Sequence, residues 1–167
     1  GKLLNSITEE NSSLADDDDI PNTQLYNVTK LGDVWELGKH KLICGDSTKA
    51  EYYDALLEDE QVDLLLTDPP YNVNYNKSEK GTILNDNMSG SNFKLFLKSA
   101  FISVNKYLKK GASFYVWYSD AESINFRTVI NDAGWKTSST LIWVKSQLVL
   151  GQSDYQSKHE ACIFGTT

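Results

Sequence analysis

The sequence predicts an α/β domain with a mainly parallel sheet. Short apolar runs alternate along the chain with segments whose apolar residues recur at helical spacing. This alternation is typical of parallel strands that are connected by covering helices. The two final strands have no helix between them, so we expect them to pair antiparallel. The predicted architecture is a partial Rossmann-like sheet, mostly parallel, with a final antiparallel strand pair.

The first predicted elements are a hairpin and a helix. Apolar residues over 34–37 and 42–44 flank Gly38-Lys39, as in a tight turn between two strands. Thr48 and Glu51 have the spacing of a capping box. We therefore expect a helix to begin at this point.

A buried strand follows over residues 62–67. Its apolar run is short and continuous, as in strands that are covered on both faces. The strand ends at Asp68-Pro69-Pro70, because prolines cannot continue the hydrogen bonds of a sheet. Residues 72–91 are polar, and so long a loop in a compact domain is usually functional or disordered.

The next helix and strand are predicted over 93–108 and 113–118. Apolar residues recur at helical spacing in the first segment, and we expect Gly111 to end this helix. The second segment is a further buried strand, and we expect Trp117 to lie in the core.

The last part of the chain predicts one helix and two strands. Ser119 and Glu122 form a second capping box, and Gly134 ends the helix that follows. Apolar runs over 140–144 and 160–164 predict the closing strands, which a polar loop connects.

Composition and charge restrict the functional classes. The chain has 167 residues, about one domain, and no apolar run that could cross a membrane. We therefore expect a cytoplasmic protein without a membrane partner. Cys44 and Cys162 are far apart in apolar surroundings, which predicts buried free thiols and no metal site. The chain has a net charge of −7 and lacks the basic patch of a dedicated DNA-binding domain. Strong binding to DNA phosphates would therefore require residues that this chain does not contain.

Two regions differ in composition. Residues 1–31 are polar, include the acidic block Asp16 to Asp19, and show no helical or strand period. We predict a flexible acidic linker there, and an ordered domain over residues 32–167.

The string Asp68-Pro69-Pro70-Tyr71, called the acceptor loop below, predicts chemistry on an amine. It follows a buried strand, and ligands of open parallel sheets bind beyond the carboxyl ends of the strands. The amine of a nucleobase is a poor nucleophile because its lone pair is delocalised into the ring. The Asp68 carboxylate and the Pro69 carbonyl could accept its hydrogen bonds from a rigid backbone. Tyr71 offers a flat face for an extruded base. A plain turn with an incidental tyrosine is the alternative.

The acceptor loop resembles motif IV of amino-methyltransferases that act on DNA. Asp at the first position is typical of adenine-N6 enzymes, and Ser is common there in cytosine-N4 enzymes. Further segments resemble successive blocks of phage-type and bacterial modification methylases; they are 32–38, 44–47, 115–117, 141–145 and 159–162. The resemblance covers about residues 32–167 and implies the N-terminal part of a β-group enzyme with a Rossmann-like methyltransferase sheet. It also implies S-adenosylmethionine as cofactor and double-stranded DNA as substrate.

The resemblance implies catalytic and cofactor roles. Asp68, held by the two prolines, would accept hydrogen bonds from the target amine, and Tyr71 would stack on the base. Asp46, with Ser47 beside it, resembles the motif III acid that approaches the adenine of the cofactor, which Asp68 would also border. Capping of the next helix is the alternative role of Asp46 and Ser47.

DNA contacts are implied for three more residues. Trp143 would pack on the other side of the base, and Asn72 and Lys145 would lie near DNA. Core packing is the alternative for Trp143. An ordinary surface charge is the alternative for Lys145.

The chain departs from the family in one respect. It has no glycine-rich cofactor loop, which a β-group enzyme carries after a target-recognition segment. We therefore expect a fragment that is inactive alone, binds S-adenosylmethionine poorly and depends on a missing C-terminal half. The strands of the cofactor loop would lie between those ending at Asp46 and Asp68, so we expect a gap or a makeshift pairing there. The exposed sheet edge would favour self-association.

Two other functions remain open. The chain could be a non-catalytic module that binds DNA or a partner with a methyltransferase-like fold, although an intact acceptor loop argues against it. It could also methylate cytosine-N4, RNA or a protein amine, although the RNA and protein enzymes usually carry Asn in place of Asp68.

Overall fold

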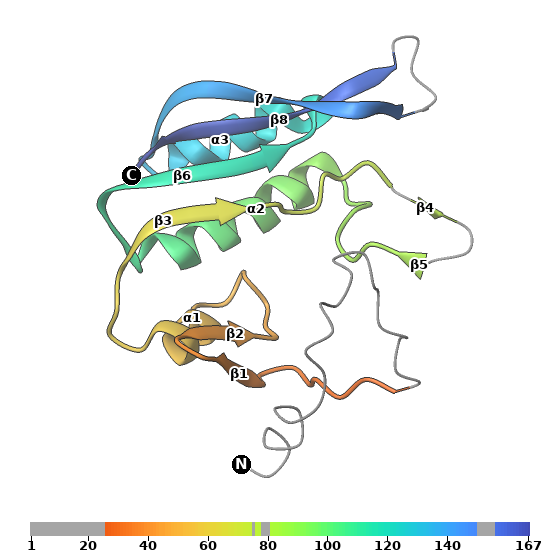
Figure 1. Cartoon of the computed structure of the whole chain (residues 1–167). Coiled ribbons are helices and arrows are strands. Elements are labelled where there is room, and N and C mark those ends of the chain that lie inside the picture. The colour runs from red at the N-terminus through yellow and green to blue at the C-terminus, as the bar shows by residue number, and fades with distance from the viewer. Residues whose placement is uncertain (1–25, 75, 78–80, 150–155) are drawn as a thin grey trace. The chain divides into compact units, whose positions relative to one another are not determined.

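Four strands form the central sheet, in the order β3-β6-β8-β7 (Figure 1). Their bounds are Val62–Thr67 for β3, Leu108–Tyr118 for β6, Lys136–Val149 for β7 and Ser157–Thr166 for β8. β3 and β6 pair parallel, whereas β8 pairs antiparallel with both β6 and β7. β3, β6 and β7 therefore run in one direction and β8 runs against them. This confirms the predicted α/β class and its closing antiparallel pair.

The computed structural model describes residues 26–74, 76–77, 81–149 and 156–167. Residues 31–167 group into one unit. The predicted linker over 1–31 lies almost wholly outside the described residues and stays a prediction. None of the helices in the described part is long and apolar enough to cross a membrane.

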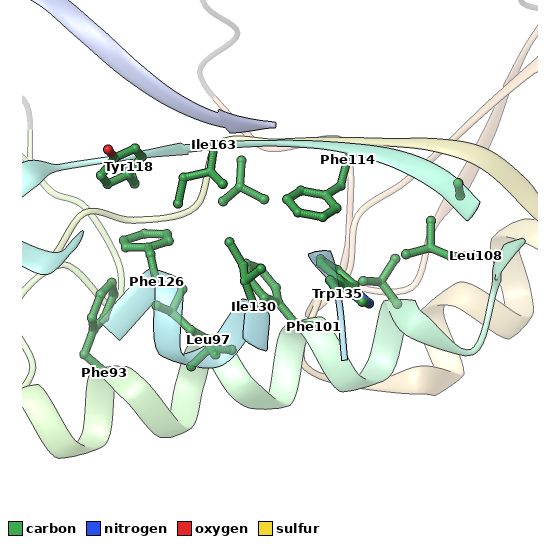
Figure 2. Close-up of a cluster of buried hydrophobic side chains, with 14 residues drawn as sticks. Phe93, Leu97, Phe101, Leu108, Phe114, Tyr118, Phe126, Ile130, Trp135 and Ile163 are labelled. Carbon is green, nitrogen blue, oxygen red and sulfur yellow. The ribbon is translucent and has the colours of Figure 1, made fainter. Parts of the chain in front are cut away.

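Helices α2 (Gly90–Asn105) and α3 (Ser123–Asp132) supply the core on one face of the sheet. Figure 2 shows the buried cluster between the helices and the sheet. Its fully buried members are Phe93, Leu97, Phe114, Val116, Phe126, Val129, Ile130 and Ile163. Burying each Leu or Phe side chain contributes roughly 1.5–3 kcal/mol. This core fixes the carboxyl ends of β3 and β6, where the acceptor loop lies.

The two glycines predicted to end helices behave differently. Gly134, at φ 79°, follows α3, and the Trp135 amide donates to the Ile130 carbonyl at 3.1 Å. That prediction is confirmed. Gly111, at φ 81°, does not end α2, because it lies inside β6. It occupies a bulge where the register with β3 shifts, and its amide donates to the Thr167 carbonyl at 3.2 Å. A bulge and a helix end both need the left-handed backbone that glycine allows.

The predicted hairpin is present as a separate two-stranded sheet. β1 (Val34–Leu37) pairs antiparallel with β2 (His40–Ile43) across a turn that begins at Gly38, φ 64°. Neither strand pairs with β3, so the makeshift pairing does not occur in the described residues. No described strand pairs with the outer edge of β3. Self-association through this edge stays a prediction.

Helix α1 (Ala50–Leu57) begins without the predicted capping box. Its N-cap is Lys49, with no side-chain capping bond. The Thr48 hydroxyl instead donates to the Asp46 carboxylate at 2.7 Å. Thr48 therefore belongs to the turn with Asp46, and Lys49 takes the capping position instead. The Thr48 carbonyl accepts a bond from Ser103 of α2 at 2.8 Å, which joins the start of α1 to the core helix.

The loop predicted over 72–91 contains a short strand pair. β4 (Asn76–Lys77) and β5 (Gly81–Thr82) pair antiparallel. The remaining polar residues of this segment lead directly into α2.

One face of the sheet lacks a cover among the described residues, which contradicts the prediction that β3 is buried on both faces. Leu64 and Leu66 are 52% and 65% exposed. Leu66 pairs in register with Tyr115, and Trp117 of β6 is only half-buried on the same face. The prediction that Trp117 lies in the core is therefore wrong for the described structure. A continuous apolar run indicates that both faces of a strand are apolar. It does not indicate whether residues of the same chain cover both faces.

Candidate active site

The acceptor loop lies where the predicted fold places it. Asp68 directly follows Thr67, the last residue of β3, which pairs with Val116 of β6. The segment after β6 begins with Ser119, whose hydroxyl donates to the Tyr71 carbonyl at 3.1 Å. The segments that follow two adjacent parallel strands therefore meet, as expected at the carboxyl edge of a parallel sheet.

Asp68 and Tyr71, the predicted acceptor and stacking residues, are hydrogen-bonded to each other. The Asp68 side chain is exposed, whereas Tyr71 is partly buried. Burial raises the pKa of the Tyr71 phenol, and hydrogen bonding to Asp68 raises this pKa further, as do the charges of Asp68 and Glu160. The phenol therefore stays protonated at neutral pH. The exposed carboxylate, which is hydrogen-bonded to this phenol, has further lone pairs that can accept hydrogen bonds from a ligand.

Asn72 directly follows the acceptor loop and is engaged within the protein. Its Nδ2 donates to the Met88 carbonyl at 3.1 Å and to Glu122 Oε1 at 2.7 Å. Its Oδ1 accepts the Met88 amide at 2.6 Å. An amide group offers two donors and one acceptor oxygen, so little capacity is left for the predicted contact with DNA.

Glu122 and Ser119 are site residues that the sequence interpretation assigned to a helix cap. α3 begins at Ser123, after the short 3-10 helix η2 (Asp120–Glu122), and neither Ser119 nor Glu122 makes a side-chain capping bond. Both bond instead to the acceptor loop or to the residue after it. The hydrogen-bond partners of Ser119 and Glu122 lie about 50 residues earlier in the chain. A local sequence pattern such as a capping box cannot predict partners at that separation.

Asp46 and Ser47, the predicted cofactor residues, lie in the turn before α1. Asp46 accepts the Thr48 amide at 2.9 Å and the Thr48 hydroxyl at 2.7 Å. These bonds lower the pKa of Asp46. They give Asp46 a structural role in this turn and do not test a cofactor role. The alternative of helix capping is wrong for Asp46, because the N-cap of α1 is Lys49 and has no side-chain capping bond.

A hollow of about 180 Å³ joins Ser47 to the acceptor loop. Its lining includes Asp68, Pro69 and Pro70, with apolar residues of β3 and α2. Asp46 is not among the lining residues. Sites for small molecules usually measure about 300–1,000 Å³, so this hollow fits only part of a cofactor.

Trp143 lies on the exposed face of β7 rather than in the core. It is 57% exposed and meets Trp117 edge to face, with ring centroids 6.0 Å apart. Its register partner on β8 is Glu160, the residue whose charge contributes to the raised pKa of Tyr71. The alternative of core packing is therefore wrong for Trp143.

Lys145 forms an ion pair with Glu160. Both side chains are less than one-third exposed, so the pair is more than an ordinary surface charge. The sequence interpretation did not single out Glu160; its strand position held no signal for this contact.

The exposed face also contains a shallow apolar hollow of about 590 Å³. It is lined by Leu66, Tyr115, Trp117, Leu141, Ile142, Trp143 and Cys162. Cys162 is buried, as predicted, whereas Cys44 is only partly buried. Within the described residues, no three His, Cys, Asp or Glu side chains are grouped so that they could hold a metal ion.

Comparisons with known proteins identify a family and similar folds. A family model described as DNA methylase, which covers N6 and N4 methylases, matches residues 62–165. No curated protein sequence matches the chain. Among solved structures, 118 chains match.

Two of these structures are of the protein M1.HpyAVI. The crystal structure of M1.HpyAVI is 18% identical, with a TM-score of 0.50, over 72% of this chain and 52% of that one. The crystal structure of the M1.HpyAVI-SAM complex is 15% identical, with a TM-score of 0.49, over 72% of this chain and 51% of that one. This chain thus spans about half the length of that protein, and the likeness is one of fold. Because the family model matches more than half of the chain, the chain belongs to the DNA methylase family.

Proposed function

We propose that this chain carries the amine-acceptor site of an S-adenosylmethionine-dependent methyltransferase that modifies adenine-N6 in DNA. Membership of the DNA methylase family gives the reaction class. The observation that carries the proposal is the exposed Asp68 carboxylate at the carboxyl end of β3, beside the partly buried Tyr71. Aspartate at the first position of the acceptor loop favours adenine over cytosine.

The residues of the acceptor loop divide the work. The Asp68 carboxylate accepts a hydrogen bond from the target amine, and this withdraws the nitrogen lone pair from the ring and makes it available for attack. The Pro69 carbonyl provides a second acceptor on a backbone that proline restricts. Tyr71 is held neutral by its raised pKa, so its ring can stack on the base without adding a second negative charge.

S-adenosylmethionine, which this family uses, supplies an electrophilic methyl group when it is bound. The hollow between Ser47 and the acceptor loop measures about 180 Å³, below the size of most cofactor sites. The described residues therefore supply part of the cofactor site, and Ser47 and Asp68 are the residues that we place at it. Asp46 supports Ser47 through the turn that it stabilises.

The proposed substrate is an adenine extruded from double-stranded DNA. An amine that is paired inside a duplex cannot reach a methyl donor held by the protein, so the base must leave the stack. Trp143, which is exposed beside Trp117, is the residue that we propose to contact the extruded base opposite Tyr71. Lys145 is paired with Glu160. We therefore propose that Lys145 holds the Glu160 side chain in place and does not serve as an unpaired cation for DNA phosphates.

The product of the reaction tests the proposal. The intact protein is incubated with duplex DNA and S-adenosylmethionine labelled in its methyl group, and the nucleosides are separated by mass spectrometry. We expect label in N6-methyladenine. Label in N4-methylcytosine would move the protein to the other branch of its family. Parallel incubations replace the DNA with RNA or with protein. Label in either of these, with none in DNA, would overturn the assignment of the substrate.

A further inference from the structure

Three segments of the chain meet directly behind the acceptor loop. They are the residues after Tyr71, the residues that lead into α2, and the start of α3. Asn72 contributes the first contact, Met88 the second and Glu122 the third. These segments are far apart in sequence, so only tertiary structure explains why their polar groups bond to one another.

Glu122 is the central residue of this network, because both its carboxylate oxygens are engaged. Oε1 accepts from Asn72 Nδ2 at 2.7 Å, and Oε2 accepts from Asn125 Nδ2 at 2.6 Å. Asn125 Nδ2 also lies 3.5 Å from the Gly90 carbonyl at the start of α2. The side chain is partly buried, and hydrogen bonds to an ionised acceptor are stronger than those between neutral groups.

Asn72 has a left-handed backbone. Its φ is 57°, a conformation that asparagine adopts more readily than other non-glycine residues and that suitable surroundings stabilise. The reciprocal bonds with the Met88 backbone and the bond to Glu122 provide those surroundings. Since Asn72 is covalently joined to Tyr71, its conformation fixes the direction in which the chain leaves the acceptor loop.

We propose that Glu122 is a positioning residue that acts through Asn72 to hold Asp68 and Tyr71 in the geometry for attack by the amine. This rests on the proposed function. Glu122 does not touch the reacting atoms. Its carboxylate fixes the Asn72 amide, Asn72 fixes the backbone after Tyr71, and Ser119 fixes the Tyr71 carbonyl from the same side.

A carboxylate suits this place better than an amide. Two amide donors, from Asn72 and Asn125, converge on Glu122, and only a carboxylate offers an acceptor oxygen to each. In Glu122→Gln, one position would present an NH2 group to another NH2 group, so one bond would be lost. The variant should therefore keep part of the positioning, whereas Glu122→Ala removes it all.

A double-mutant cycle in the intact protein tests the proposal through activity. We expect Glu122→Ala to lower kcat by about 10- to 100-fold, the scale of a misplacement by about 1 Å. KM for S-adenosylmethionine should change little, and Glu122→Gln should fall between wild type and Glu122→Ala. Asn72→Ala should lose as much, and the double variant should be no worse than the worse single one. Asp120→Asn, at an exposed residue of the same turn, is the matched control with unchanged kcat. Additive losses in the double variant would overturn action through Asn72.

Amide hydrogen exchange separates a failure of this proposal from a failure of the proposed function. The Met88 amide, which donates to Asn72, should exchange faster in Glu122→Ala and Glu122→Gln, while peptides of β6 stay protected. Suppose that exchange at Met88 is faster in the variants but the wild-type protein is inactive. This result would support the positioning role of Glu122 and would overturn only the proposed function. Unchanged exchange at Met88 would overturn the proposal that Glu122 holds Asn72, whatever the activity.

Discussion

The hydroxyl of Ser119 donates a hydrogen bond to the backbone carbonyl of Tyr71 at 3.1 Å. Ser119 follows β6 and Tyr71 follows β3, so this bond joins the two parallel strands at the edge where the site lies. Without such a bond the acceptor loop would be more mobile, and the reacting groups would be held less accurately in the geometry that the reaction needs.

Removing this bond should affect both stability and activity. We expect Ser119→Ala to lower the free energy of unfolding by about 0.5–1.5 kcal/mol, the net contribution of an ordinary hydrogen bond. Methylation should fall because the Tyr71 carbonyl is no longer held. Denaturant unfolding and initial rates measure the two effects.

Ser99→Ala provides the matched control. Ser99 also donates to a backbone carbonyl, that of Leu95 at 3.0 Å, but on an exposed part of α2. This variant should keep full activity. Equal losses of activity in both variants would show that the Ser119 bond has no special role.

Tyr71 gives the protein a distinct alkaline titration. Its pKa is raised by burial first and by Asp68 and Glu160 next, so the folded state retains this proton to a higher pH than the unfolded state does. Its contribution to stability is therefore present in full below pH of about 10, the ordinary pKa of tyrosine, and is lost as pH rises above it. Tyr71→Phe should remove this part of the pH dependence.

Tyrosinate absorbance measures this titration. The pKa values of Tyr53 and Tyr107 are also raised, so the difference between wild type and Tyr71→Phe isolates the contribution of Tyr71. A difference curve with a midpoint near pH 10 or below would contradict the buried contact with Asp68.

Asp46 separates a structural role from a cofactor role. In Asp46→Asn the side-chain oxygen can still accept both bonds from Thr48, so the turn before α1 should persist. If the carboxylate also binds the cofactor, affinity for S-adenosylmethionine should fall tenfold or more, because a hydrogen bond to a charged group contributes about 1.5–3 kcal/mol. Calorimetric titration of the intact protein measures this affinity. Unchanged affinity would leave Asp46 with the structural role alone.

Trp143 should matter for the base and little for the fold. It is 57% exposed, so Trp143→Ala should leave the unfolding temperature almost unchanged. Stacking on a base contributes about 1–3 kcal/mol, so kcat/KM for DNA should fall roughly 5- to 150-fold. Ile142→Ala, at a neighbouring residue that is 54% exposed, is the control. Equal effects of the two substitutions would indicate a general apolar contact rather than stacking.

The sequence predicted those features that depend on neighbouring residues. The turn at Gly38, the end of α3 at Gly134 and the proline-bounded loop after β3 follow from local backbone chemistry, and the structure contains all three. The closing antiparallel pair follows from the absence of a helix between β7 and β8. The acceptor loop was recognisable because its four residues are contiguous.

The features that the sequence did not predict depend on tertiary partners. Ser119 and Glu122 have the spacing of a capping box, but stronger partners lie in a distant loop. Gly111 would need the same left-handed backbone conformation at the end of a helix as in a bulge, so the glycine alone does not distinguish the two. The apolar residues Leu64 and Leu66 predict a covered strand, but no sequence pattern states which part of a protein covers it.

Substitution of Asp68 shows whether the acceptor loop is the site of methyl transfer. Single-turnover methylation of duplex DNA should be compared between the intact wild-type protein and Asp68→Ala, both saturated with S-adenosylmethionine. Loss of one preorganised polar group at a reacting centre costs about 10²–10³-fold in rate, so we expect a loss of at least that size with cofactor binding retained. A rate in Asp68→Ala within a fewfold of wild type would contradict the account, because the acceptor loop would then not be the site of the reaction.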